Sequence, residues 1–208
     1  MCIRDSIPAI LFQWYGGERE GEVIADVLFG KVNPSGSLCY SIPQSVGHLP
    51  IHYNRLPSDK GIYRSPGTIN KPGRDYVFST PEPLWPFGYG LSYSDFTYEK
   101  IESVKQDKKN IRVTVSVKNT SGRDGEEVVQ LYASYPDSKV ERPSKQLRAF
   151  RRIPIKAGET RKVTLTVPKE ELGYWNEGKQ MFVVEPGTVK LLIGASSEDI
   201  RLEGKIRL

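Results

Sequence analysis

The chain has few of the residues that cross-linked proteins and metalloproteins depend on. Only two of its 208 residues are cysteines, Cys2 and Cys39, and they are too far apart for a CxxC pair. This excludes a disulfide framework and a cysteine-rich zinc site. The two histidines, His48 and His52, would share one face of a helix, but Pro50 lies between them and interrupts any helix there. We therefore expect no metal and no cofactor.

Long apolar runs are also lacking. No stretch approaches the roughly 20 residues that a membrane helix needs, so we expect no membrane partner. Residues 1–6 (MCIRDS) lack the basic region and apolar stretch of a secretory signal. We interpret them as non-native sequence and expect the native pattern to begin at Ile7, in the middle of a domain.

Charge is unevenly distributed along the chain. The net charge is +5, with 26% charged residues, which is ordinary for a soluble protein. Residues 1–98 hold eight Lys and Arg against nine Asp and Glu, whereas residues 99–208 hold 22 against 16. Basic clusters lie at 105–109 and 148–152, with acidic residues interspersed along this half of the chain. We interpret these clusters as a solvated face and expect no nucleic-acid partner.

Residues 7–42 have the pattern of a β-α-β unit. Residues 7–15 form an apolar run typical of a buried parallel strand. Glu18, Glu20 and Glu22 then favour a helix start, and Gly30 favours its end. Residues 37–42 predict a second strand. One such unit cannot cover both faces of its sheet, so we expect it to be the end of a larger α/β domain.

Residues 43–90 show no sustained period, yet they are rich in proline and in aromatic side chains. Because disordered linkers are poor in aromatic residues, we expect this connection to be ordered.

The second half alternates in polarity, as strands do. At residues 111–117 (IRVTVSV), every second side chain is apolar. Strands are predicted at 96–104, 111–117, 127–134, 146–153, 161–167, 180–184, 189–195 and 200–206. The short strands and regular turns indicate a fibronectin-III-like β-sandwich.

Four segments carry a resemblance to a known family. The first contains WYGG at 14–17, IADVLFG at 24–30 and NPSG at 33–36, and the third is PFGYGLSY at 86–93. The second is Leu49-Pro50 with Tyr53, Asn54 and Pro57, and the fourth is Arg142-Pro143 with Lys145, Leu147 and Phe150, followed by EPG at 185–187 and Ile193-Gly194. Together they resemble the C-terminal part of glycoside hydrolase family 3, the β-glucosidase and β-xylosidase family.

The resemblance implies a domain layout and an activity. Residues 7–90 would be the C-terminal end of the family's α/β sandwich domain with its connecting loop, and residues 91–208 its fibronectin type III-like domain. The fold class is therefore mainly β, with the last β-α-β portion of an α/β sandwich domain before the fibronectin-like β-sandwich. The parent would be a retaining exo-β-glycosidase that hydrolyses terminal β-linked glucose or xylose, with its barrel and most of its sandwich domain before Ile7. We expect such a parent to be periplasmic or secreted.

The resemblance also implies that both catalytic carboxylates lie upstream. Retaining glycosidases need two carboxyl groups about 5–5.5 Å apart. In the family these are an aspartate of the barrel and commonly a glutamate earlier in the sandwich domain, so we expect no catalytic residue here and an inactive isolated chain. Asp95 follows a serine, as that nucleophile does, but we interpret it as a surface residue. Glu18 and Glu20 are explained by the helix start.

Two interpretations of residues 52–55 stay open. His52, Tyr53, Asn54 and Arg55 either support the structure or line a sugar subsite, because ordered loops often carry ligand sites. An alternative to the glycosidase is a non-catalytic fibronectin-like module that binds a carbohydrate or a protein. For Trp14, Trp85 and Trp175 we favour packing in the core or between domains, and for Cys39 a buried position.

Overall fold

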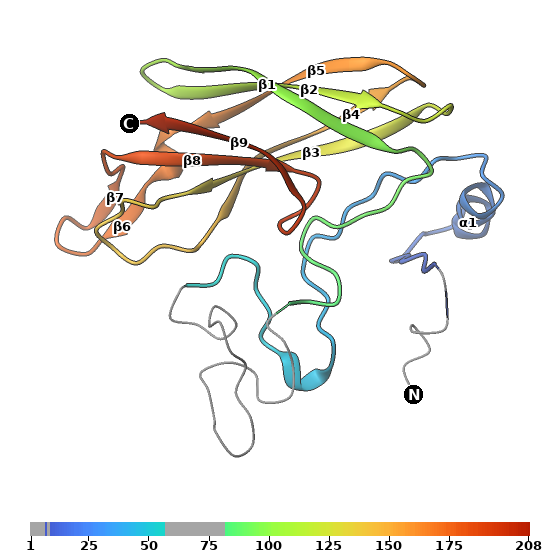
Figure 1. Cartoon of the computed structure of the whole chain (residues 1–208). Coiled ribbons are helices and arrows are strands. Elements are labelled where there is room, and N and C mark those ends of the chain that lie inside the picture. The colour runs from blue at the N-terminus through green and yellow to red at the C-terminus, as the bar shows by residue number, and fades with distance from the viewer. Residues whose placement is uncertain (1–6, 8, 57–81) are drawn as a thin grey trace.

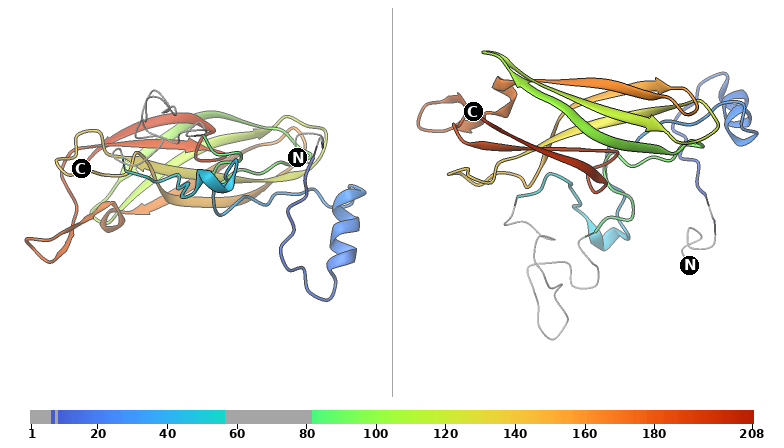
Figure 2. Two further views of the ribbon diagram at one scale, coloured as in Figure 1. Left: turned by 90° about the horizontal axis from the view of Figure 1, so that it is seen from below. Right: turned by 45° about the horizontal axis from the view of Figure 1, so that its top comes forward.

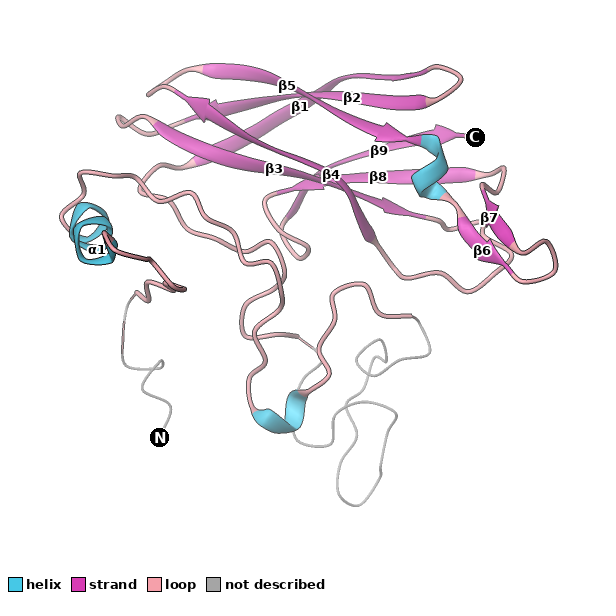
Figure 3. Ribbon diagram, turned by 180° about the vertical axis from the view of Figure 1, so that it is seen from behind, coloured by secondary structure: helices cyan, strands magenta, loops and turns pink. Residues whose placement is uncertain are grey.

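The fold is seen in a computed structural model that describes residues 7, 9–56 and 82–208. Two antiparallel sheets form a β-sandwich, with a three-stranded sheet in the order β1-β2-β5 and a four-stranded sheet in the order β4-β3-β8-β9 (Figure 1). A hairpin of β6 and β7 extends from one end of the sandwich (Figure 3). The strands are β1 (Phe96–Gln106), β2 (Asn110–Asn119), β3 (Gly125–Ser134), β4 (Gln146–Ile155), β5 (Thr160–Pro168), β6 (Tyr174–Asn176), β7 (Met181–Val183), β8 (Thr188–Gly194) and β9 (Ile200–Arg207).

The predicted mainly-β fold is confirmed. Its core comes from the apolar side of each alternating strand, because successive side chains point to opposite faces. On β2 the predicted face, Ile111, Val113, Val115 and Val117, is completely buried. It meets the inner face of the other sheet, where Leu131 is equally buried. Only β6 has no counterpart among the predicted strands.

Helices are few in the described residues. The α-helix α1 (Glu20–Leu28) begins among the predicted acidic residues and ends just before Gly30. It stands apart from the sandwich, at the end opposite the β6–β7 hairpin (Figures 1 and 2). Two short 3₁₀ helices are η2 (Val46–His48) and η3 (Lys169–Leu172). Within the described residues, no helix is long and apolar enough to cross a membrane.

Both strands predicted beside α1 are wrong. Residues 9–15 and 37–41 have no strand structure, and Ile42 makes a single isolated bridge with Trp85. A parallel strand exists only where neighbouring strands take up its hydrogen bonds, and the described residues supply no such neighbours. The predicted burial of Cys39 is wrong for the same reason: its thiol is exposed.

We predict that Leu131→Ala will lower the free energy of unfolding by about 2–5 kcal/mol, because the cavity lies where neither sheet can close it. Urea denaturation of the chain measures the change. Leu91 is 68% exposed, so Leu91→Ala is the matched control and should change stability by less than about 0.5 kcal/mol. An equal loss in both variants would contradict the assignment of the core.

Candidate functional site

The segments that carry the NPSG and PFGYGLSY motifs lie side by side along one side of the sandwich. Leu38 N donates to Tyr89 O and Gly88 N to Leu38 O, both at 2.8 Å. Further along, Ile42 N donates to Trp85 O, also at 2.8 Å. Residues 33–42 and 84–94 therefore run antiparallel as a pair, which we call the linker pair. It passes below the four-stranded sheet in Figure 1.

The side-chain amide of Asn33 joins the linker pair to the sandwich. Its Nδ2 donates to Ser94 Oγ and to Asp124 O, each at 2.9 Å. Its Oδ1 accepts from Tyr93 N at 2.8 Å and from Ser92 Oγ at 2.9 Å. All the usual bonds of one amide are thus made, to the segment 92–94 and to the turn between β2 and β3. Asn33 is in this way the hydrogen-bonding centre of NPSG.

Arg123, in the same turn, secures the end of α1. Its guanidinium donates to Gly30 O and lies over the ring of Tyr93, 5.4 Å from the centroid. The Tyr93 hydroxyl in turn donates to Val27 O at 2.8 Å. The helix is therefore attached to the sandwich by polar contacts, although none of its residues is buried.

Gln130 of β3 forms the second attachment point. Its side chain is 2% exposed, and Nε2 donates to Gly88 O at 3.1 Å and to Ala195 O at 2.6 Å. Its Oε1 accepts the Tyr132 hydroxyl at 2.5 Å. A Cβ at residue 88 would lie 2.2 Å from Oε1, and the φ of Gly88 is +82°. The left-handed backbone favours glycine at this position of the GYG motif, and a Cβ there would also displace the Gln130 amide.

The structure places Tyr53, one of the candidate sugar-binding residues, against the sandwich. Its ring stacks on Phe87, with centroids 4.2 Å apart, and meets the edge of Tyr132 at 5.9 Å. Its hydroxyl accepts a hydrogen bond from Leu147 N at 3.2 Å. The Tyr53 ring therefore packs against Phe87 and Tyr132 of the protein itself.

The other three candidates lie differently. His52 and Asn54 are exposed, and Arg55 is half-buried, with its carbonyl accepting from Ser144 N at 3.4 Å. Residues 44–56, which we call the arm, lie beyond the four-stranded sheet on the side of the linker pair (Figures 1 and 2). The arm thus presents His52 and Asn54 to its surroundings. His48 is fully buried, and its Nδ1 accepts from Gln44 N at 3.2 Å.

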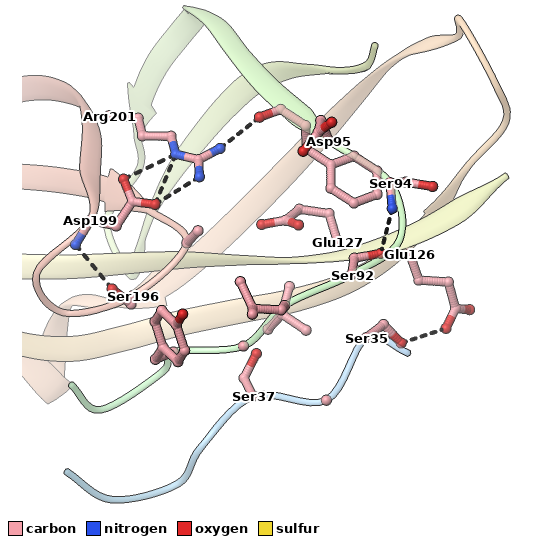
Figure 4. Close-up of a pocket in the computed structure, with 17 residues that line it drawn as sticks. Ser35, Ser37, Ser92, Ser94, Asp95, Glu126, Glu127, Ser196, Asp199 and Arg201 are labelled. Atoms are coloured by element: carbon pink, nitrogen blue, oxygen red, sulfur yellow. Dashed lines mark hydrogen bonds and ion pairs between the residues drawn. The ribbon is translucent and has the colours of Figure 1, made fainter. Parts of the chain in front are cut away.

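A polar pocket of about 250 Å³ lies where the linker pair meets β3 and the β8–β9 turn (Figure 4). Glu127 points into it and accepts the Tyr98 hydroxyl at 2.9 Å. Arg201 lies beside it, paired with Asp199 at 2.7 Å and donating to Phe96 O at 2.6 Å. The Arg201 guanidinium also covers the Tyr98 ring at 4.9 Å. These contacts tie the start of β1 to β9.

Burial controls the acidity of this network. It raises the pKa of Glu127, although the Tyr98 hydrogen bond and the charge of Arg201 act in the opposite direction. Burial, followed by the Glu127 charge, raises the pKa of Tyr98 well above its usual value. Glu126, the adjacent residue, pairs with Arg152 and accepts from Ser35 Oγ at 3.2 Å. Both glutamates therefore have structural partners.

Other residues named from the sequence are peripheral. Asp95 is exposed, as predicted for a surface residue. Trp14 and Trp175 are 56% and 49% exposed and lie outside the core, whereas Trp85 is half-buried. In the part of the chain that the structure describes, no group of three or more His, Cys, Asp or Glu side chains is arranged to hold a metal ion.

Two family models match the chain. The model of the glycosyl hydrolase family 3 C-terminal domain matches residues 2–93, and that of the fibronectin type III-like domain matches residues 127–197. A β-xylosidase of Formosa agariphila is 41% identical over 94% of the chain and 26% of its own length. The thermostable β-glucosidase B of Acetivibrio thermocellus is 38% identical over 98% of the chain and 27% of its own length. The chain belongs to glycosyl hydrolase family 3.

Solved structures of the family agree with this assignment. A β-glucosidase from Erythrobacter marinus superposes with a TM-score of 0.84 and 35% identity, covering 99% of the chain and 26% of that protein. The β-glucosidase from Listeria innocua in complex with glucose gives 0.83 and 35%, covering 99% and 28%. The chain thus spans about a quarter of the length of the family 3 relatives that it matches.

Sequence reasoning missed the residues of β3 that attach the linker pair to the sandwich in this family 3 chain. Gln130 and Tyr132 lie on the face of β3 opposite the core, yet they are 2% and 0% exposed. In a sheet with one solvated face, such positions would be open to water. The sequence carried no signal for this burial, because Gln130 and Tyr132 alternate with apolar residues along β3 as side chains on a solvated face also do.

We predict that Asn33→Ala will lower the free energy of unfolding by about 1–3 kcal/mol, because it leaves part-buried hydrogen-bonding partners unpaired. Thermal or urea unfolding measures the effect. Ser35→Ala removes only one bond, of 3.2 Å, to a glutamate that keeps Arg152, and serves as the control. If both variants unfold alike, the amide is not the centre of this attachment.

We predict a pH-dependent effect of Glu127→Gln. Because the folded state raises the pKa of Glu127, ionisation costs stability above the folded pKa, and this cost disappears as pH falls toward the ordinary value of 4.5. Glutamine can still accept the Tyr98 hydroxyl but cannot ionise. The stability of the wild type relative to the variant should therefore rise as pH falls from 7 to 4.5, as followed by urea denaturation. A difference that is constant with pH, or that shrinks, would contradict the direction of the pKa shift.

Proposed function

We propose that this chain is the C-terminal part of a retaining exo-β-glycosidase that hydrolyses terminal β-linked glucose or xylose. One observation supports this most strongly: the linker pair, the arm and the sandwich superpose together on a β-glucosidase over 99% of the chain. Curated relatives with 41% and 38% identity are named as a β-xylosidase and a β-glucosidase. Their names differ in the sugar, so the proposal includes both glucose and xylose.

The proposed domain layout assigns residues 7–90 to the end of an α/β sandwich domain with its loop, and residues 91–208 to a fibronectin-like domain. The exposed side chains near α1 support this layout. Phe12, Val23, Leu28 and Phe29 are 47–89% exposed, and such a concentration of apolar surface is typical of an interface. We propose that upstream sandwich and barrel domains of the same polypeptide cover it. Residues 1–6 lie outside the described residues.

In this proposal the chain contributes structure and substrate contacts while the catalytic pair lies upstream. Glu126 and Glu127 are engaged by Arg152 and Tyr98, and Asp199 by Arg201. A retaining glycosidase needs a nucleophile and an acid/base facing one glycosidic bond. We assign the substrate contacts in this chain to the arm, through His52 and Asn54.

We predict that the purified 208-residue chain will not hydrolyse aryl β-glucosides or aryl β-xylosides above the buffer rate. Release of the aryl group, followed by absorbance, measures this directly. The positive control is the polypeptide encoded with its upstream reading frame, which we expect to be active. Hydrolysis by the chain itself, abolished by Asp95→Asn or Glu127→Gln, would show that the catalytic carboxylates lie here.

A further inference from the structure

We propose that Tyr53 and Tyr132 are positioning residues, through which the fibronectin-like sandwich holds His52 and Asn54 in place for the sugar. This inference rests on the proposed function and deepens it. It also changes the assignment of Tyr53, whose ring contacts the protein instead of the substrate.

The first support is the way the arm is anchored. Tyr53 is sandwiched between the linker pair and β3, with Phe87 stacked at an interplanar angle of 19° and Tyr132 edge-on at 74°. Aromatic pairs with these geometries stabilise a contact beyond the area that they bury. Its flanking residues, His52 and Asn54, remain exposed. The anchor therefore lies directly between the two side chains proposed to contact the sugar.

The second support is a chain of hydrogen bonds behind the anchor. Leu147 N, at the start of β4, donates to the Tyr53 hydroxyl at 3.2 Å. Tyr132 donates to Gln130 at 2.5 Å, and Gln130 donates to Gly88 O in the segment that carries Phe87. Tyr132, whose ring meets Tyr53, and the segment that carries Phe87 are thus linked through Gln130. Displacing either tyrosine would displace the arm without touching the sandwich core, because Leu131 and Ala133 point the other way.

Side chains that bind a substrate equally in its ground and transition states affect KM and leave kcat unchanged. If the arm is displaced part of the time, a smaller fraction of the molecules can bind substrate, and this also raises KM without changing kcat. A positioning role therefore predicts a change in KM with an unchanged kcat.

Three single-hydroxyl deletions test the inference. Tyr53→Phe and Tyr132→Phe each remove one bond of the anchor and keep the ring. Tyr98→Phe is the matched control: it removes one hydrogen-bonded hydroxyl of a buried tyrosine from the same sandwich, but that hydroxyl bonds Glu127, away from the arm. Losing one such bond changes the equilibrium between the docked and the displaced arm by roughly two- to tenfold.

Hydrogen exchange of residues 44–56 is measured first, in the 208-residue chain. Both test variants should exchange faster there by about two- to tenfold, and Tyr98→Phe should match the wild type. Unchanged exchange in Tyr53→Phe and Tyr132→Phe overturns the anchor, whatever the enzyme does.

Steady-state kinetics on an aryl β-glycoside are then measured in the longer polypeptide. KM should rise in Tyr53→Phe and Tyr132→Phe, by at most the factor measured in exchange, because KM depends on the fraction of molecules with the arm in place. KM should stay unchanged in Tyr98→Phe, and kcat should be unchanged in all three variants. A loss of kcat at constant KM in Tyr53→Phe would overturn the positioning role. Absence of hydrolysis by the wild-type longer polypeptide would instead overturn the proposed function and the sugar role with it, and the exchange data would separately decide the anchor.

Discussion

The buried amide of Gln130 is the constraint on which the outer face of the four-stranded sheet depends. A buried amide must find partners, since an unpaired polar group away from water costs about 1–3 kcal/mol. Gln130 finds them in Gly88, Ala195 and Tyr132, that is, in the linker pair, the end of β8 and its own strand. Removing the linker pair would leave Gln130 without one of these partners and would expose Tyr132. The linker pair therefore completes the sandwich.

Close approaches explain why glycine occupies two positions of the motifs. Gly88 must let Gln130 approach, and Gly90 must let the backbone of Gly36 approach, since a Cβ at residue 90 would lie 2.1 Å from Gly36 O. Asn33 then locks the two motifs to the β2–β3 turn. NPSG and PFGYGLSY are thus two halves of one contact, formed by residues about 60 positions apart. Their joint presence in the sequence has a structural reason.

Prediction from the sequence succeeded where an element stabilises itself by a repeating pattern. β2 was predicted from the alternation of Ile111, Val113, Val115 and Val117, and α1 from the acidic residues at its start. It failed at residues 9–15, where an apolar run predicted a strand, and at residues 37–41, which form none. Such a run indicates burial, but a strand also needs a hydrogen-bonding neighbour, and pattern alone does not supply one. For the candidate site, a sugar role of residues 52–55 stays a prediction, and the packing of Tyr53 against Phe87 and Tyr132 was not predicted.

The sequence by itself determined the class of the sandwich, the places of most of its strands and the family to which the chain belongs. These depend on local periodicity and on short motifs, and both can be read along one dimension. Only the tertiary structure decided that Asn33, Gln130 and Tyr53 are attachment points, and that Glu127 is held by Tyr98. Most of these hydrogen bonds join residues that are 29 to 94 positions apart in the sequence. The bond of Tyr132 to Gln130 is local. Because polar side chains have no periodic signature, their partners become known only when the chain is folded.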